Sequence, residues 1–101
     1  MIIVYTTFSS QEEAEKVMNE ILLKKLIACV NFFPIKSLYW WNEKIENSEE
    51  VVAIAKTKAE NWEKVKSEIK GLHPYEVPCI FKINVEADKE YDSWINRTAE
   101  N

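Results

Sequence analysis

The 101-residue sequence is poor in glycine and cysteine, and each scarcity excludes a class of function. It has one glycine, whereas phosphate-binding loops and dinucleotide-binding turns need several to bring the backbone close to the ligand. Its two cysteines, Cys29 and Cys79, stand without a Cys-x-x-Cys pair or a Cys/His cluster nearby. We therefore expect two reduced thiols, and neither a disulfide framework nor a structural zinc site.

The sequence also lacks the features of membrane and nucleic-acid binding. No apolar run approaches the roughly 20 residues that a membrane-spanning helix needs, and the first residues lack the basic region and cleavage site of a secretory signal. The net charge is −4, and no lysine or arginine cluster with interleaved aromatics is present to bind a phosphate backbone. We expect a cytoplasmic protein that binds neither a membrane nor nucleic acid.

What is present is typical of one folded domain, expected over residues 1–101, with 47% hydrophobic and 30% charged residues. β-branched and aromatic runs predict strands at Ile2–Phe8, at Leu26–Phe33 continuing to Trp41, at Ile45–Lys56 and at Val77–Val85. Helical stripes lie after the first and third runs, and Asp88 can cap a short last helix. This order predicts an α+β, split βαβ fold, with an antiparallel sheet and helices on one face.

Two capping-box spacings indicate where the longer helices begin. Ser9-Ser10 is followed three residues later by Glu12 and Glu13, and Thr57 is followed three residues later by Glu60. We therefore expect one helix to begin near Ser10 and the other at Thr57, with Gly71 ending the second.

Three adjacent aromatic residues, Tyr39, Trp40 and Trp41, lie just before the predicted hairpin tip Asn42–Lys44. In a strand, Tyr39 and Trp41 share one face and Trp40 occupies the other, so both faces need to be covered. A second copy of the chain would cover one of them, although a central strand in a monomer's core is the alternative. We expect a subunit interface at Trp40 and Trp41.

The sole histidine, His73, has two interpretations. It follows a predicted helix and is suited to capping that helix. Imidazole and thiolate also suit copper or zinc, so His73 and Cys29 would supply two ligands if the fold or a neighbouring subunit brought them together. A hydrolase with Cys29 as nucleophile, His73 as base and Glu76 as orienting acid lacks any elbow or oxyanion-loop signature. We expect no catalytic residue and no enzyme.

Lys56 also has two interpretations, because it lies beside the predicted helix start at Thr57. A cation and free backbone donors at that place would hold an anion. A solvated lysine at a strand end is the alternative.

Several segments together resemble one known family, and they follow one another in the same order over nearly the whole chain. They are Val4-Tyr5-Thr6-Thr7, Leu26-Ile27-Ala28-Cys29-Val30-Asn31, Ser37-Leu38-Tyr39-Trp40-Trp41 with Lys44-Ile45-Glu46, Lys56-Thr57, His73-Pro74-Tyr75-Glu76-Val77-Pro78 and Tyr91-Asp92-Ser93-Trp94. The set is similar to the CutA family of divalent-cation tolerance proteins.

This resemblance implies a ferredoxin-like fold assembled as a homotrimer, in which the long hairpin pairs with neighbouring subunits, as in PII-type signalling trimers. It implies tolerance to divalent metal ions, copper above all, with metal ligands at Cys29 and His73. It also implies clefts between subunits that gather Tyr39, Trp41, Lys56 and Glu76. A small anion or metabolite in those clefts is the alternative to metal binding.

Overall fold

The computed structural model describes residues 1–100, so Asn101, the last residue of the predicted domain, lies outside the described residues. The strands are β1 (Ile2–Phe8), β2 (Cys29–Trp41), β3 (Lys44–Thr57) and β4 (Ile80–Asn84). The helices are α1 (Gln11–Leu23), α2 (Trp62–Leu72) and α3 (Lys89–Thr98), and a 3₁₀ turn, η1 (Ala59–Asn61), precedes α2. The element order is the one that the sequence predicts.

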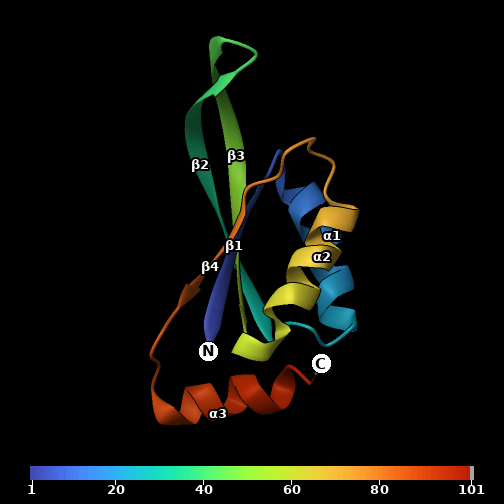
Figure 1. Ribbon diagram of the computed structural model, residues 1–101, viewed down its shortest axis with the longest axis vertical. Coiled ribbons are helices and arrows are strands. Elements are labelled where there is room, and N and C mark those ends of the chain that lie inside the picture. Colours follow the sequence, from blue (N-terminus) through green and yellow to red (C-terminus); the bar gives the residue numbers. More distant parts are fainter. Residues whose placement is uncertain (101) are drawn as a thin grey trace.

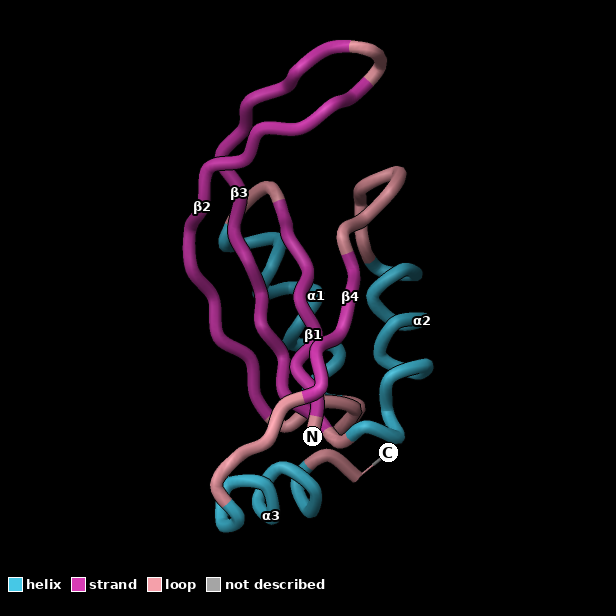
Figure 2. The backbone as a smooth tube through the Cα atoms, turned by 60° about the vertical axis from the view of Figure 1, so that its left-hand side comes forward, coloured by secondary structure: helices cyan, strands magenta, loops and turns pink. Residues whose placement is uncertain are grey.

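The strands form one antiparallel sheet in the order β2-β3-β1-β4, with α1 and α2 side by side on one face (Figures 1 and 2). Alternate residues of β1 point toward these helices and are fully buried, as the two-residue period of a strand requires. The core between sheet and helices contains Ile2, Val4, Phe8, Ala14, Met18, Ile21, Ala53, Ala55, Val65 and Ile69. The predicted α+β, ferredoxin-like class is confirmed.

Helix α1 begins and ends as its sequence directs. The Ser10 hydroxyl accepts a hydrogen bond from the Glu13 backbone N–H, while the Glu13 carboxylate accepts one from the Ser9 N–H. At the other end, Lys25 adopts a left-handed conformation with φ 57°, its N–H donates to the Leu22 carbonyl, and the Leu26 N–H donates to the Ile21 carbonyl. This paired arrangement satisfies the last carbonyls of the helix.

The predicted helix start at Thr57 is wrong. Thr57 is the last residue of β3, and α2 begins five residues later at Trp62. The Thr57 hydroxyl donates 2.7 Å to the Leu26 carbonyl, and the Asn61 amide donates to the same carbonyl at 3.0 Å. The hydroxyl of the buried Thr57 therefore bonds to the loop before β2, so it does not cap a helix.

Strands β2 and β3 form a long hairpin that projects beyond the body of the molecule (Figure 1). With the hairpin included, the molecule measures 45 × 24 × 22 Å. The tip is the two-residue turn Asn42-Glu43, with φ of 50° and 64°, so Lys44 belongs to β3 rather than to the turn. Pro34 lies within β2, which is an edge strand and therefore tolerates a residue without an N–H.

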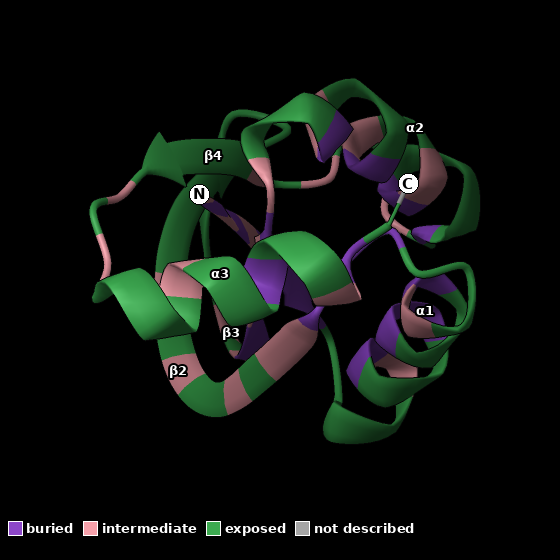
Figure 3. Cartoon of the chain, turned by 90° about the horizontal axis from the view of Figure 1, so that it is seen from below, coloured by how far each residue is buried: buried purple, intermediate pink, exposed green. Residues whose placement is uncertain are grey.

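Helix α3 crosses the end of the sheet that lies away from the hairpin tip (Figures 1 and 3). Its buried residue Ile95 packs with Ala28 and Ala99, and with the partly buried Met1 and Cys29. Strand β4 is shorter than the predicted Val77–Val85, and Cys79 precedes it as an exposed residue. None of the helices in residues 1–100 has the length and apolar character needed to cross a bilayer.

Candidate functional site

His73 is a structural residue of the helix-to-strand connection in this conformation. It caps the C-terminus of α2, and its side chain is buried against Phe8, with ring centroids 4.5 Å apart. Nδ1 accepts from the Tyr75 N–H at 3.1 Å, so the proton lies on Nε2, which donates to the Thr7 carbonyl at 2.7 Å. Burial lowers the pKa of His73, which keeps the ring neutral.

Cys29 lies at the opposite end of the sheet, at the first residue of β2. It is half-buried, and its Sγ is 3.4 Å from the Tyr91 hydroxyl of α3. Cys29 pairs with Lys56 on β3, which in turn pairs with Ile3 on β1. Its thiol is thus partly covered by α3 at this end of the sheet.

The structure does not bring Cys29 and His73 together within one chain. Cys29 is level with Ile3, whereas His73 bonds to Thr7, four residues farther along β1 and therefore about 13 Å away along the strand. Both His73 nitrogens already have partners, so neither offers a free lone pair to a metal. Across residues 1–100, no three His, Cys, Asp or Glu side chains gather into a metal-binding group. At Cys29 a single chain accordingly supplies one thiol as a metal ligand, and one donor is too few for a closed metal site.

Three of the four predicted cleft residues do meet, in a hollow that runs along the projecting hairpin and has a volume of about 610 Å³. Tyr39 and Trp41 come from β2, and Glu76 comes from the connection between α2 and β4. We call this site the aromatic hollow. It is lined by Tyr5, Thr7, Ile35, Ser37, Leu38, Tyr39, Trp40, Trp41, Glu50, Tyr75, Glu76, Val77 and Cys79.

Glu50 and Tyr75, which were not predicted from the sequence, join the two sides of the aromatic hollow. The Tyr75 hydroxyl donates to Glu50 Oε2 at 2.8 Å, and burial together with this hydrogen bond raises the pKa of Tyr75. Tyr75 also packs edge-on against His73, with ring centroids 4.6 Å apart. The available signal was the place of Tyr75 within His73–Pro78, because a side chain two residues from a helix cap is well placed to fold back onto the sheet.

Lys56 is not part of the aromatic hollow. It lies within β3 opposite Cys29, whereas Tyr39 is ten residues farther along β2, roughly 30 Å away along the strand. Its predicted partner, the N-terminus of a helix at Thr57, does not exist there. The grouping of Lys56 with Tyr39, Trp41 and Glu76 is therefore not formed within one chain.

The hairpin carries its large apolar side chains in the open. Leu38, Trp40 and Ile45 are 73%, 71% and 64% exposed, and the pairing of Trp40 with Ile45 puts these two side by side. The sheet face away from α1 and α2 is also apolar, with Phe33, Phe81 and Ile83 exposed and Tyr5 stacked on Phe81 at 4.7 Å. Apolar surface of this extent is typical of a protein–protein contact.

Comparison with known proteins places these features in one family. The family model described as CutA1 divalent ion tolerance protein matches residues 2–98. The chain is 49% identical over 96 residues to the divalent-cation tolerance protein CutA of Pyrococcus horikoshii. The matched segment covers 94% of each of the two chains.

Solved structures agree with this assignment. A CutA structure from Archaeoglobus fulgidus superposes with a TM-score of 0.94 at 46% identity, over 99% of this chain and 100% of that one. The PII-like protein CutA from Nostoc sp. PCC 7120 superposes with a TM-score of 0.92 at 28% identity, over 99% and 98% of the two chains.

The prediction of a cytoplasmic location is wrong in the light of these relatives. The Archaeoglobus fulgidus protein, similar over the full length of this chain, is described as a periplasmic divalent cation tolerance protein. The absence of a recognisable signal near Met1 was a weak basis for assigning a compartment.

The fold, the position of the hairpin and the match over residues 2–98 agree with one another, and the chain belongs to the CutA1 divalent ion tolerance protein family.

Proposed function

We propose that this chain is a single-domain, non-catalytic protein that assembles as a homotrimer and binds divalent metal ions, copper in particular, in the response to those ions. The observation that carries the assembly is the exposed hairpin. Leu38, Trp40 and Ile45 are largely exposed on the hairpin, which projects beyond the body of the molecule (Figure 1). Burial of such side chains contributes about 25 cal/mol per Å², which favours contact with a second copy.

Two different exposed surfaces support a ring assembly, and three subunits are the number that the family resemblance implies. The exposed hairpin and the exposed sheet face, with Phe81 and Ile83, are different patches of one chain. A contact between two different patches is head-to-tail, and such contacts close into a ring when the rotation permits. Trp40 and Trp41 are the proposed interface residues.

Cys29 is the proposed metal ligand in each subunit. Its thiol is half-buried beside the Tyr91 hydroxyl, and thiolate is a preferred ligand of copper. A site shared between subunits would add donors that one chain lacks. His73 would join such a site only by giving up its hydrogen bonds to Thr7 and Tyr75.

Native mass spectrometry of the metal-stripped protein, before and after addition of copper(II) or zinc(II), tests this proposal. We expect a trimer that takes up about one copper ion per subunit. Cys29→Ala should abolish uptake, while Cys79→Ala, the matched control thiol, should leave it unchanged. A trimer that stays metal-free at micromolar copper, or equal uptake by both variants, would contradict the metal assignment.

The assembly has its own test. Trp40→Asp places a charge in the proposed interface and should dissociate the trimer, at a cost of several kcal/mol. Leu23→Asp is the control, because Leu23 is 76% exposed on α1, away from the hairpin. If Trp40→Asp remains as stable a trimer as Leu23→Asp, the interface is misplaced.

A second candidate function is that of a PII-like trimer that binds a small molecule, favoured by the meeting of Tyr39, Trp41 and Glu76 in the aromatic hollow. The anionic ligand expected for such a site depends on Lys56, which a neighbouring subunit would have to supply, because Lys56 lies away from the aromatic hollow of its own chain. A library of small molecules screened for a shift in thermal stability tests this candidate, since a ligand that binds only the folded state stabilises it. A library without any stabilising compound would count against it.

A further inference from the structure

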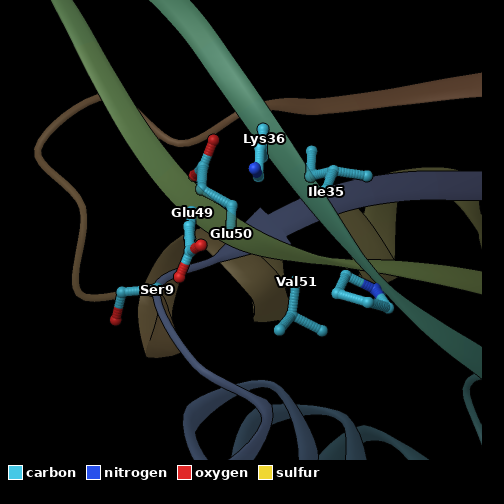
Figure 4. A pocket seen from close by; sticks show the side chains of 7 residues that line it. Ser9, Ile35, Lys36, Glu49, Glu50 and Val51 are labelled. Atoms are coloured by element: carbon cyan, nitrogen blue, oxygen red, sulfur yellow. The ribbon is translucent and has the colours of Figure 1, made fainter.

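A hollow beside the start of α1 contributes no ligand for a copper-type ion. Its volume is about 450 Å³, and it is lined by Ser9, Pro34, Ile35, Lys36, Glu49, Glu50 and Val51 (Figure 4). It offers carboxylates and one amine but neither thiol nor imidazole, and Lys36 lies opposite Glu49 in the strand pairing. Carboxylates suit magnesium and calcium rather than copper. A site for a thiol-seeking metal ion therefore centres on a cysteine.

The two cysteines differ in how their thiols are held. Cys79 is exposed just before β4, whereas Cys29 Sγ is 3.4 Å from the Tyr91 hydroxyl, a hydrogen-bonding distance for sulfur. A cysteine side chain has three staggered positions about its Cα–Cβ bond, and the contact with Tyr91 favours one of them. Cys29 is thus a thiol whose direction is fixed.

Helix α3 places Tyr91 beside Cys29 through contacts of its own. Asp88 caps the helix by accepting hydrogen bonds from the backbone N–H groups of Glu90 and Tyr91, at 3.1 and 3.4 Å. Farther along the helix, Ile95 is fully buried in the small cluster against which Cys29 also packs. The position of the Tyr91 hydroxyl therefore comes from the docking of the helix, and the hydroxyl itself is free to serve the thiol.

The direction of this hydrogen bond is determined once the sulfur ligates a metal ion. A thiol and a phenol hydroxyl can each donate to the other. A metal-bound sulfur has lost its proton, so only the Tyr91 hydroxyl can then donate. Hydrogen bonds made to a metal ligand from outside the ligand shell orient that ligand, and their loss typically costs about 10- to 100-fold in metal affinity.

We propose that Tyr91 is a positioning residue of the Cys29 metal site. Its hydroxyl donates to the ligating sulfur, stabilises the negative charge there and directs the sulfur toward the metal ion. This inference rests on the proposed metal function of Cys29 and adds a residue that controls it. The contact lies within one chain, so it does not depend on the donors that a neighbouring subunit brings.

Two substitutions on the same helix separate the hydroxyl from the packing. Tyr91→Phe removes one oxygen and keeps the ring that stacks on Trp94, with ring centroids 5.9 Å apart. Trp94→Phe is the matched control, because it disturbs the same ring pair but leaves the hydroxyl beside Cys29. Both are made in a Cys79→Ala background, so that Cys29 is the only thiol.

The test is titration of the metal-stripped oligomer with cadmium(II), a thiol-seeking divalent ion that does not oxidise sulfur, in competition with a chelator. Tyr91→Phe should weaken cadmium binding at least about tenfold and shift the sulfur-to-cadmium charge-transfer absorption. Trp94→Phe should weaken binding by less than about twofold and leave the absorption unmoved. A merely structural role of Tyr91 would change the affinity but not the absorption of the loaded site.

The infrared S–H stretching band of the metal-free protein reports the same contact without a metal ion. It should shift in Tyr91→Phe and stay in place in Trp94→Phe, because the band responds to hydrogen bonding of the thiol. Equal effects of the two substitutions on cadmium affinity, or a charge-transfer or S–H band that Tyr91→Phe leaves unmoved, would overturn the role of Tyr91 while the metal site stands. Absence of cadmium uptake by the background protein would instead overturn the metal function of Cys29, and the role of Tyr91 with it.

Discussion

His73→Ala should destabilise the protein strongly, although His73 was predicted as a metal ligand. The change removes two hydrogen bonds, Nε2 to the Thr7 carbonyl at 2.7 Å and the Tyr75 N–H to Nδ1 at 3.1 Å. Each contributes about 1 kcal/mol, and the stacking on Phe8 contributes about 1 kcal/mol more. We expect a loss of about 3 kcal/mol in the free energy of unfolding, measured by urea titration at pH 8 and one fixed protein concentration.

The pH dependence of the same quantity follows from the lowered pKa of His73. In the unfolded chain a histidine titrates near about 6.5, and in the folded chain burial makes this one titrate lower. Between these two pKa values the unfolded state binds more protons, so stability is complete above about pH 6.5 and falls as the pH drops below it. Because His73 is the only histidine, His73→Asn should flatten the curve between about pH 7 and pH 5.5.

Two results would refute this reasoning. One is a loss below about 0.5 kcal/mol for His73→Ala, the range of an ordinary surface substitution. The other is a wild-type free energy that stays constant from pH 7 to pH 5.5. Copper uptake by His73→Asn then separates the two roles of the ring: a structural His73 leaves the uptake intact, whereas a ligand at His73 makes uptake disappear along with the pH dependence.

Three further substitutions probe the packing, each by urea or thermal unfolding at fixed protein concentration. Thr6→Val should stabilise the protein by about 1 kcal/mol, because Thr6 Oγ1 is buried without a hydrogen-bond partner in the described residues; destabilisation would reveal a hidden partner. Lys25→Gly should raise the free energy of unfolding by about 1 kcal/mol, since φ is 57° at Lys25 and glycine adopts this conformation without strain. Lys24→Gly is the control: Lys24 has a right-handed conformation, so this change should lower the free energy of unfolding. Asn61→Ala should cost about 2 kcal/mol through the loss of its bonds to Leu26 and Thr57, and no change in unfolding would discount that network.

The fold was predictable where the pattern depends on neighbours in the sequence. The β-branched and aromatic run Ile2–Phe8 and the cap at Ser10 act within a few residues, and the structure confirms both. The hairpin turn also lies where the sequence predicts it, although it is one residue shorter than predicted. Thr57 has the same spacing to a glutamate as Ser10, yet it does not cap a helix. Its partner is the Leu26 carbonyl, 31 residues earlier, which no local pattern reveals.

The candidate site was less predictable because it depends on strand register. Each of the three candidate ligands, Cys29, Lys56 and His73, is plausible by itself. The strand register puts Cys29 beside Lys56, level with Ile3 of β1, whereas His73 bonds to Thr7, four residues farther along that strand. The gathering of Tyr39, Trp41 and Glu76 came from the family resemblance rather than from spacing. Glu50 was overlooked since a glutamate at the start of an apolar strand is ordinarily a solvated residue.

The place of β1 at the centre of the sheet has a consequence for synthesis of the chain. Although β1 leaves the ribosome first, its two partners are β3 and β4, and β4 ends only at Asn84. The β2–β3 hairpin closes through a two-residue turn, so it can form while the chain is still growing. The first strand, in contrast, stays unpaired until β3 has emerged, and one of its edges stays open until β4 follows. This interval is when a nascent chain is most exposed to aggregation and to chaperones.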